Sequence, residues 1–345
     1  MEPALKRQRL GACMTGNGLM CALAIDQGIS LTRALTAASG NASDADARAA
    51  EFKTVLAKWL SPDASAILLD HRFGDACQAV TDTGTGILRA YETDVYGGDS
   101  ETVTTLPPSE SVRRLAQRGA DAIKLHMYYD PDAPSDENAV KQALIERVGA
   151  ECQANDVPFL FEPLSYRQGV EAGTAAFAAI KPDIVRRSVA EFSKPGYRID
   201  ILKIEFPIDL ALVAGTQTAE REGGSPNCSM AEALDHFRAT ADAAGCPFVF
   251  LSAGVTLEAF AEGLELAGKA GVPYGGYLCG RAVWRPAIEI FGKGGSSALA
   301  DWAKGEGRER LRHLTAIANE TAVPLVNAAE VNAEPARHAA QGHGQ

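Results

Sequence analysis

Eight short runs rich in apolar residues recur along this chain of 345 residues, and segments with helical spacing separate them. Strands that alternate with helices pair in parallel, and eight such units close into a barrel. No GxGxxG motif follows the first run, which disfavours the alternative of an open, doubly wound sheet. We therefore predict an α/β protein with one domain, a (β/α)8 TIM barrel. The predicted strands are residues 18–26, 65–70, 87–92, 122–129, 157–164, 199–207, 247–255 and 274–284.

The helical segments set the predicted boundaries of the barrel. We expect an N-terminal arm over residues 1–17, the barrel over 18–322, and a C-terminal tail over 323–345 that lacks apolar periodicity and is predicted to be disordered. One helix is predicted between residues 70 and 84, and Ser109 is the expected N-cap of the next helix, at 109–118. Loops are predicted at 97–108 and 223–229, and the main helices at 44–60, 109–118, 136–155, 182–192, 230–244, 257–270 and onward to about 322.

Composition excludes several classes of protein. The formal net charge of −11 argues against nucleic acid as a main partner. No run reaches the length of a membrane span, and seven scattered cysteines without a CxxC pair indicate reduced thiols in a cytoplasmic protein. The histidines show no HxH, HxxH or HExxH spacing, so we expect no metal and no cofactor. The oligomeric state is left open, a homo-oligomer included.

The sixth run, residues 199–207, contains a lysine and a glutamate two residues apart, Lys203 and Glu205. Because side chains alternate along a strand, both lie on one face. A buried cation costs several kcal/mol unless it is paired, neutralised or used. Two interpretations follow: a structural Lys–Glu pair, or a lysine that forms a Schiff base.

Polar residues occupy the ends of nearly all the predicted strands. Active sites of TIM barrels lie at the carboxyl ends of the strands, so these side chains are predicted to meet at one mouth. Each residue alone is also explained as a helix cap or a loop anchor. The set comprises Asp26, Asp70, Glu92, Lys124, Glu162, Lys203, Glu205, Ser252 and Arg281.

Two lysines and several acids in one mouth favour amine chemistry. A second cation, Lys124, and apolar neighbours favour the neutral amine of Lys203, which attacks a ketone and forms an iminium that accepts electrons. The adjacent carbon–carbon bond breaks when Glu162 or Asp26 removes a hydroxyl proton. His126 shares a strand face with Lys124 and is either a packed histidine or a group behind the site. Gly and polar residues after strands seven and eight fit a phosphate site, although small residues are also common in turns: Ser252, Gly254, Gly280 and Arg281.

These motifs, in this order over roughly residues 18–290, resemble the class I tagatose-1,6-bisphosphate aldolase family. The resemblance is carried by AIDQ at 24–27, ADAIKL at 120–125, YYDP at 128–131, ERVG at 146–149, FEPLSY at 161–166, EFSKP at 191–195, DILKIE at 200–205, LSAGV at 251–255 and CGRA at 279–282.

The resemblance implies a metal-independent barrel aldolase that cleaves a phosphorylated ketose to dihydroxyacetone phosphate and an aldehyde. By motif position, Lys203 resembles the Schiff-base lysine, Lys124 the second lysine, and Glu162 the acid/base. Asp26 is expected in the catalytic set, and Glu205 is expected to tune or orient Lys203. The substrate-binding residues implied are Gln27, Glu205, Ser252, Gly254, Gly280 and Arg281, with the last four around the C1 phosphate.

The chain departs from the family pattern at two places. Gly28 stands where the family usually has arginine, and the sequence DHRFG at 70–74 replaces a stretch with proline and acidic residues. The substrate is therefore expected to be either a ketose 1-phosphate or a 1,6-bisphosphate. The alternatives are a sulfofructose-1-phosphate aldolase that gives sulfolactaldehyde, a non-catalytic sugar-phosphate sensor, and a barrel isomerase or decarboxylase.

Overall fold

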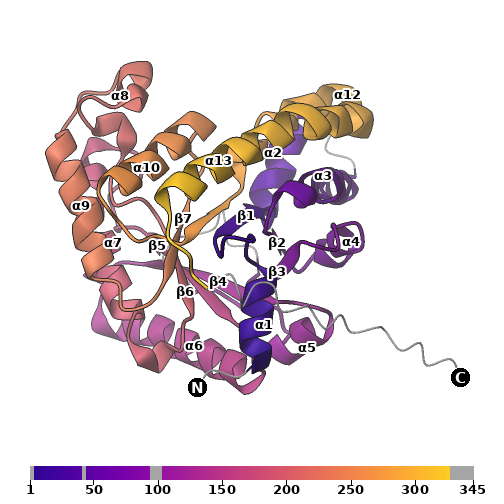
Figure 1. Cartoon of the computed structure of the whole chain (residues 1–345), viewed down its shortest axis with the longest axis horizontal. Coiled ribbons are helices and arrows are strands. Elements are labelled where there is room, and N and C mark those ends of the chain that lie inside the picture. The colour runs from indigo at the N-terminus through magenta and orange to yellow at the C-terminus, as the bar shows by residue number, and fades with distance from the viewer. Residues whose placement is uncertain (1–3, 41–43, 94–102, 327–345) are drawn as a thin grey trace, which may run out of the picture.

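The strands of this computed structural model, which describes residues 4–40, 44–93 and 103–326, form one closed parallel barrel in chain order. Figure 1 shows the helices arranged around it. This confirms the predicted TIM barrel, and each strand overlaps the run predicted for it. The strands are β1 (Met20–Ala24), β2 (Ala66–Leu69), β3 (Gly86–Ala90), β4 (Ala122–Tyr129), β5 (Phe159–Ser165), β6 (Ile201–Ile204), β7 (Phe248–Leu251) and β8 (Gly276–Cys279).

The helices follow the predicted pattern with additions. Four were not predicted, namely α1, α2, α8 and α11, and the last of these replaces the end of the run predicted as the eighth strand, 274–284. Among the described helices, none combines the length and the apolar character needed to cross a membrane. The helices are α1 (Ala4–Ala12), α2 (Ile29–Ser39), α3 (Ala45–Leu60), α4 (Gly74–Gln78), α5 (Val112–Gln117), α6 (Ser135–Ala154), α7 (Ala175–Phe192), α8 (Gln217–Glu222), α9 (Met230–Asp242), α10 (Leu257–Lys269), α11 (Arg281–Trp284), α12 (Ala287–Trp302) and α13 (Arg308–Thr321).

The differences in helix boundaries have local causes. The side chain of Ser111, not Ser109, caps α5 by accepting a hydrogen bond from the amide of Arg114. Helix α7 starts earlier than predicted because Thr174 caps it, and Pro182 lies inside the helix rather than at its start. Helix α2 follows Gly28 without a side-chain cap, so the sequence carries no start signal there.

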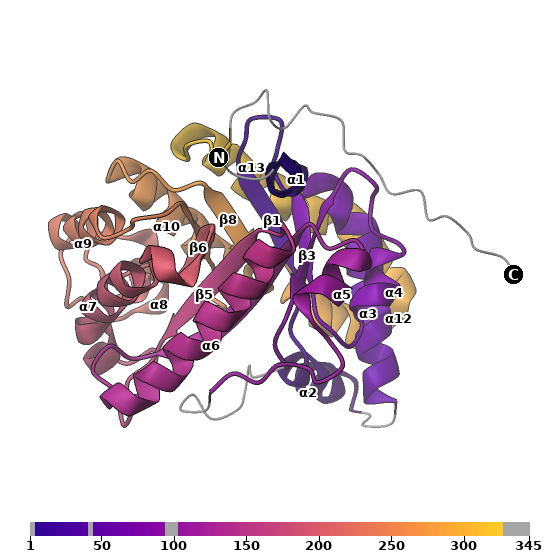
Figure 2. The same ribbon diagram turned by 90° about the horizontal axis from the view of Figure 1, so that it is seen from below.

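The interior of the barrel is apolar near the amino ends of the strands. Leu10, Leu325 and Val326 pack against this layer, so residues from both ends of the chain close that end of the barrel. Figure 2 places α1 at the opposite end of the barrel from α2, which follows the carboxyl end of β1. The layer consists of Cys13, Met14, Met20, Ala22, Ala24, Ala66, Leu68, Leu88, Ala90, Ala122, Leu160, Ile201, Val249 and Leu278.

The predicted arm and tail both contact this end. In α1, Lys6 forms an ion pair with Asp200 at 2.6 Å. Residues 323–326 hydrogen-bond to Tyr274 and Gly18 through backbone amides at 2.9 and 2.8 Å. The remainder of the predicted tail, 327–345, and the part of the predicted loop at 97–102 lie outside the described residues.

One buried acid makes the stability of this fold depend on pH. Asp121 accepts a hydrogen bond from the amide of Ile87 at 2.8 Å. Burial raises the pKa of Asp121 to about 6, against the opposing effects of that hydrogen bond and of Arg9. A raised pKa means that the folded state favours the protonated acid, so the charged form destabilises the fold as pH rises.

We expect Asp121→Asn to stabilise the protein, because the amide oxygen still accepts the hydrogen bond and no charge is buried. The gain in free energy of unfolding should be about 1 kcal/mol larger at pH 8 than at pH 5. Urea unfolding at the two pH values measures this difference. A gain that is equal at both pH values, or larger at pH 5, would contradict the assignment.

Candidate active site

Three neighbouring strands place two lysines and a glutamate in one buried layer: Lys124 on β4, Glu162 on β5 and Lys203 on β6. Each follows an inward-facing apolar residue by two positions. Because side chains alternate with a period of two, all three face the interior, directly above the apolar layer. The apolar residues beneath them are Ala122, Leu160 and Ile201.

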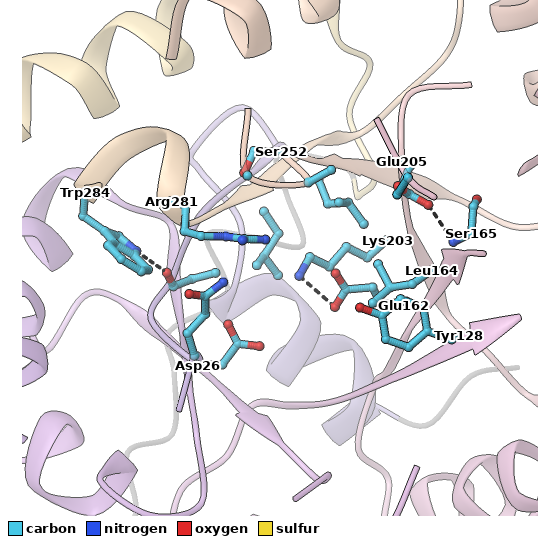
Figure 3. Close-up of a pocket in the computed structure, with 18 residues that line it drawn as sticks. Asp26, Tyr128, Glu162, Leu164, Ser165, Lys203, Glu205, Ser252, Arg281 and Trp284 are labelled. Carbon is cyan, nitrogen blue, oxygen red and sulfur yellow. Dashed lines mark hydrogen bonds and ion pairs between the residues drawn. The ribbon is translucent and has the colours of Figure 1, made fainter. Parts of the chain in front are cut away.

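The carboxylate of Glu162 lies between the two lysines. Its Oε2 atom is 2.8 Å from Nζ of Lys124 and 2.9 Å from Nζ of Lys203. Figure 3 shows the amine of Lys203 directed at this carboxylate. Burial raises the pKa of Glu162, but the two lysines outweigh burial, and the net pKa is far below the ordinary value. Glu162 is therefore ionised and positioned to exchange a proton with either amine.

Lys124 joins three carboxylates. Besides Glu162, its Nζ atom lies 3.0 Å from Oδ2 of Asp26 and 2.6 Å from Oε1 of Glu92. Burial raises the pKa of Asp26 and of Glu92, but Lys124 outweighs it and leaves the pKa of each below its ordinary value. An ammonium group has three N–H donors, and here each has a carboxylate within hydrogen-bond distance.

A pocket of about 210 Å³ opens above this layer at the carboxyl ends of the strands (Figure 3). Lys124 is not among its lining residues, because it lies beneath the floor. The other residues predicted as catalytic or substrate-binding by motif position all line it: Asp26, Gln27, Glu162, Lys203, Glu205, Ser252, Gly254, Gly280 and Arg281.

Glu205 has partners other than Lys203. Its Oε2 atom accepts a hydrogen bond from the amide of Ser165 at 2.7 Å, and its Oε1 atom lies 3.7 Å from Nζ of Lys181. Lys203 is instead paired with Glu162, which lies on the neighbouring strand. The two residues share a strand face, as alternation predicts, but they do not form the structural pair considered from the sequence.

The loops after β7 and β8 bring a cation against glycine. Gly254 has φ +81°, and a Cβ atom at this position would lie 2.7 Å from the guanidinium carbon of Arg281. Arg285 donates a hydrogen bond to the carbonyl of Gly254. Trp284 lies in α11, the helix that follows β8, and its indole N–H donates a hydrogen bond to the carbonyl of Ala24 at 2.8 Å. This hydrogen bond connects α11 to β1. Glycine is thus required where the guanidinium enters the pocket.

Two predicted features turn out differently. Asp70 does not reach the pocket, because its Oδ2 atom pairs with Nζ of Lys53, on α3, at 3.0 Å. Glu92, predicted at the mouth, and His126, predicted as either a packed histidine or a group behind the site, both belong to the buried cluster around Lys124, with His126 Nδ1 2.7 Å from Glu92 Oε1. Tyr128 also lines the pocket. Its spacing from Lys124 by four residues on one strand is the signal that predicts this position.

Within the described ranges, no group of three or more His, Cys, Asp or Glu side chains is arranged to hold a metal ion. Independence from metal stays a prediction.

Comparisons with known proteins identify the family of this chain. The sequence model of the DeoC/LacD family aldolases matches residues 20–286. Tagatose 1,6-diphosphate aldolase of Listeria monocytogenes is 40% identical over 311 residues, which are 89% of each chain. Tagatose 1,6-diphosphate aldolase 2 of Enterococcus faecalis is 39% identical, over 92% of this chain and 94% of that protein. The enzyme of Lactococcus lactis is 36% identical, over 92% and 97%.

A solved structure with the same architecture is fructose-bisphosphate aldolase from Plasmodium falciparum. It matches with a TM-score of 0.66 at 13% identity and covers 92% of this chain and 95% of that one. This similarity concerns the fold alone. The fold, the site and the relatives together define a TIM-barrel aldolase, an aldehyde-lyase. The chain belongs to the DeoC/LacD family of aldolases.

The geometry around Lys124 predicts a large effect on stability. We expect Lys124→Met to lower the free energy of unfolding at pH 7 by about 3 kcal/mol or more, because three buried carboxylates lose their shared counter-charge. Acids with lowered folded-state pKa values contribute stability above their ordinary pKa, near 4, and that contribution is lost as pH falls. The deficit of the variant should therefore narrow as pH is lowered below about 4, as urea unfolding will measure.

Lys181→Met is the matched control, because the ion pair given for Lys181 is with one carboxylate, that of Glu205, at the longer distance of 3.7 Å. We expect a cost below about 1 kcal/mol for it. Equal losses in the two variants would show that Lys124 is not the centre of the charge cluster.

Proposed function

We propose that this protein is a class I aldolase that cleaves a ketose 1-phosphate or 1,6-bisphosphate to dihydroxyacetone phosphate and an aldehyde, without a metal. The observation that carries the proposal is the carboxylate of Glu162 between two lysine amines, at 2.8 and 2.9 Å, at the floor of the pocket. The names of the relatives support a sugar-phosphate substrate.

In the proposed reaction, Glu162 first takes a proton from the amine of Lys203, and the neutral amine then attacks the C2 carbonyl of the ketose. The resulting carbinolamine loses water with a proton supplied by Glu162, and an iminium forms. Glu162, ionised again, then removes the proton of the C4 hydroxyl while the C3–C4 bond breaks. The bonding electrons pass into the iminium to give an enamine, and the aldehyde leaves. Protonation at C3 and addition of water release dihydroxyacetone phosphate and restore Lys203.

The C1 phosphate is assigned to Arg281, Ser252 and the backbone amides of Gly254 and Gly280. A guanidinium and converging N–H groups are the ordinary partners of a phosphate. Among the described residues that line the pocket, the cationic side chains are Lys203 and Arg281. Arg281 thus matches one phosphate, which supports a ketose 1-phosphate, whereas the relatives' names support a 1,6-bisphosphate. Sulfofructose 1-phosphate is a third candidate substrate.

Schiff-base formation predicts covalent trapping. Incubation with dihydroxyacetone phosphate and borohydride in the presence of EDTA should reduce the iminium to a stable amine on Lys203, located by peptide mass spectrometry. Lys203→Met should give no adduct, and Lys181→Met should give the same yield as the wild type. Absence of an adduct on Lys203, or loss of cleavage in EDTA that returns with added metal, would contradict the proposal.

The substrate class is tested with tagatose 1,6-bisphosphate, fructose 1,6-bisphosphate, tagatose 1-phosphate and sulfofructose 1-phosphate. Arg281→Met should raise KM for all of them about 10- to 100-fold, because a charge-assisted contact to phosphate is lost. Gly28→Arg, which adds a cation beside Gln27, should raise kcat/KM about fivefold for the bisphosphates and not for the 1-phosphate. An equal effect on both would exclude a distal phosphate near residue 28.

A further inference from the structure

The imidazole of His126 lies fully buried behind the pocket, and no step of the proposed reaction uses it. Its Nδ1 atom is 2.7 Å from Oε1 of Glu92 and 3.1 Å from Nζ of Lys124. The backbone at this position is also held, because Thr104 donates its hydroxyl to the carbonyl of His126 at 2.7 Å. A histidine with these contacts has a defined orientation toward the charge cluster.

The contacts determine which ring nitrogen bears the proton. Lys124 has three N–H groups and three carboxylates within 3.0 Å, so its donors are accounted for without His126. An ionised carboxylate only accepts hydrogen bonds. A lone pair on Nδ1 would face the oxygen of Glu92 at 2.7 Å, which is repulsive. The Nδ1 atom therefore carries a hydrogen and donates it to Glu92.

Glu92 links this histidine to the lysine. Its Oε1 atom accepts from both His126 and Lys124, at 2.7 and 2.6 Å. Burial raises the pKa of Glu92, and Lys124 and His126 outweigh it. His126 thus helps to keep Glu92 ionised, and an ionised Glu92 in turn fixes the ammonium of Lys124.

We propose that His126 is a positioning residue: its Nδ1–H group holds Glu92 in place, and Glu92 holds Lys124 against the acid/base Glu162. The effect of His126 on the reaction rate rests on the proposed aldolase reaction. The hydrogen bond from His126 to Glu92 does not depend on which reaction the protein catalyses. The charged groups of the cluster that His126 joins come from five strands of the barrel or their ends: Asp26 after β1, Glu92 after β3, Lys124 on β4, Glu162 on β5 and Lys203 on β6.

Two variants separate the hydrogen bond from packing. His126→Leu fills the buried space but cannot donate, whereas His126→Asn places an amide N–H near the position of Nδ1. We expect kcat of His126→Leu to fall about tenfold or more, because small displacements of catalytic groups are costly, while KM stays within about twofold. His126→Asn should recover most of the rate. His313→Leu, at an exposed position on α13, is the control and should match the wild type.

The pH profile is the readout that simple loss of packing does not move. Without the donor, Glu92 protonates at higher pH, so activity on the acidic side should begin to fall at a higher pH in His126→Leu than in the wild type. Unchanged kcat and pH profile in a folded His126→Leu protein would overturn the proposal. So would an His126→Asn variant that is folded and as slow as His126→Leu.

A measurement independent of activity tests the hydrogen bond directly. In protein labelled with 15N at histidine, the imidazole signals that disappear in His126→Leu identify His126, and their coupling pattern reports the tautomer. The Nδ1–H form is expected, and its proton signal should shift in Glu92→Gln. The Nε2–H form would overturn the proposal. Absence of a borohydride adduct on Lys203 would instead overturn the aldolase mechanism and leave this result intact.

Discussion

A buried carboxylate shared by two lysines is the interaction on which the site depends. Removing an ion from water costs several kcal/mol, so charges such as Glu162, Lys124 and Lys203 stay buried only when they are paired closely. Asp26 and Glu92 complete the set, and their contacts to Lys124 are 3.0 Å or shorter. Three carboxylates thus meet two lysine side chains, so acidic groups outnumber the lysines in the cluster. Such an environment favours a cation in the pocket, such as the iminium of the proposed reaction.

The barrel surrounds this cluster with an apolar floor and a polar mouth. Below it, Leu10, Leu325 and Val326 pack against the apolar layer, so this layer lies between the lysines and the amino end of the barrel. Electrostatic interactions are stronger where water is excluded, which makes each ion pair more effective and each unpaired charge more costly. The arm and the start of the tail therefore serve the site, although they lie at the opposite end of the barrel.

The sequence predicts the inner residues of this arrangement well, because a strand has a strict period of two. Lys124, Glu162 and Lys203 each follow an inward apolar residue by two positions, and the periodicity continues to the end of the strand. Asp70 has the same spacing from the inward Leu68. Strand β2 ends at Leu69, however, and the chain then turns, which lets Asp70 pair with a lysine on α3. No sequence pattern indicates that partner.

The sequence pattern also does not indicate which side chains of neighbouring strands lie side by side. The register places His126 beside Glu162 and Lys203 beside Val249, and this register determines which charges meet. Lys203 therefore pairs with a glutamate on β5 rather than with Glu205, two residues away on its own strand. The alternation of side chains identifies a face, whereas partners depend on the closure of the barrel.

This pairing resolves an apparent conflict in the role proposed for Glu162. A carboxylate whose pKa is held far below its ordinary value is a weak base, yet the reaction requires it to accept a hydroxyl proton. Its pKa is held down partly by Lys203. In the proposed mechanism Lys203 becomes an iminium, which keeps one positive charge but only one N–H donor, and that charge is delocalised toward the substrate. Glu162 then retains Lys124 as its main partner and becomes more basic at the step that needs a base. Formation of the iminium on Lys203 is thus what raises the basicity of Glu162.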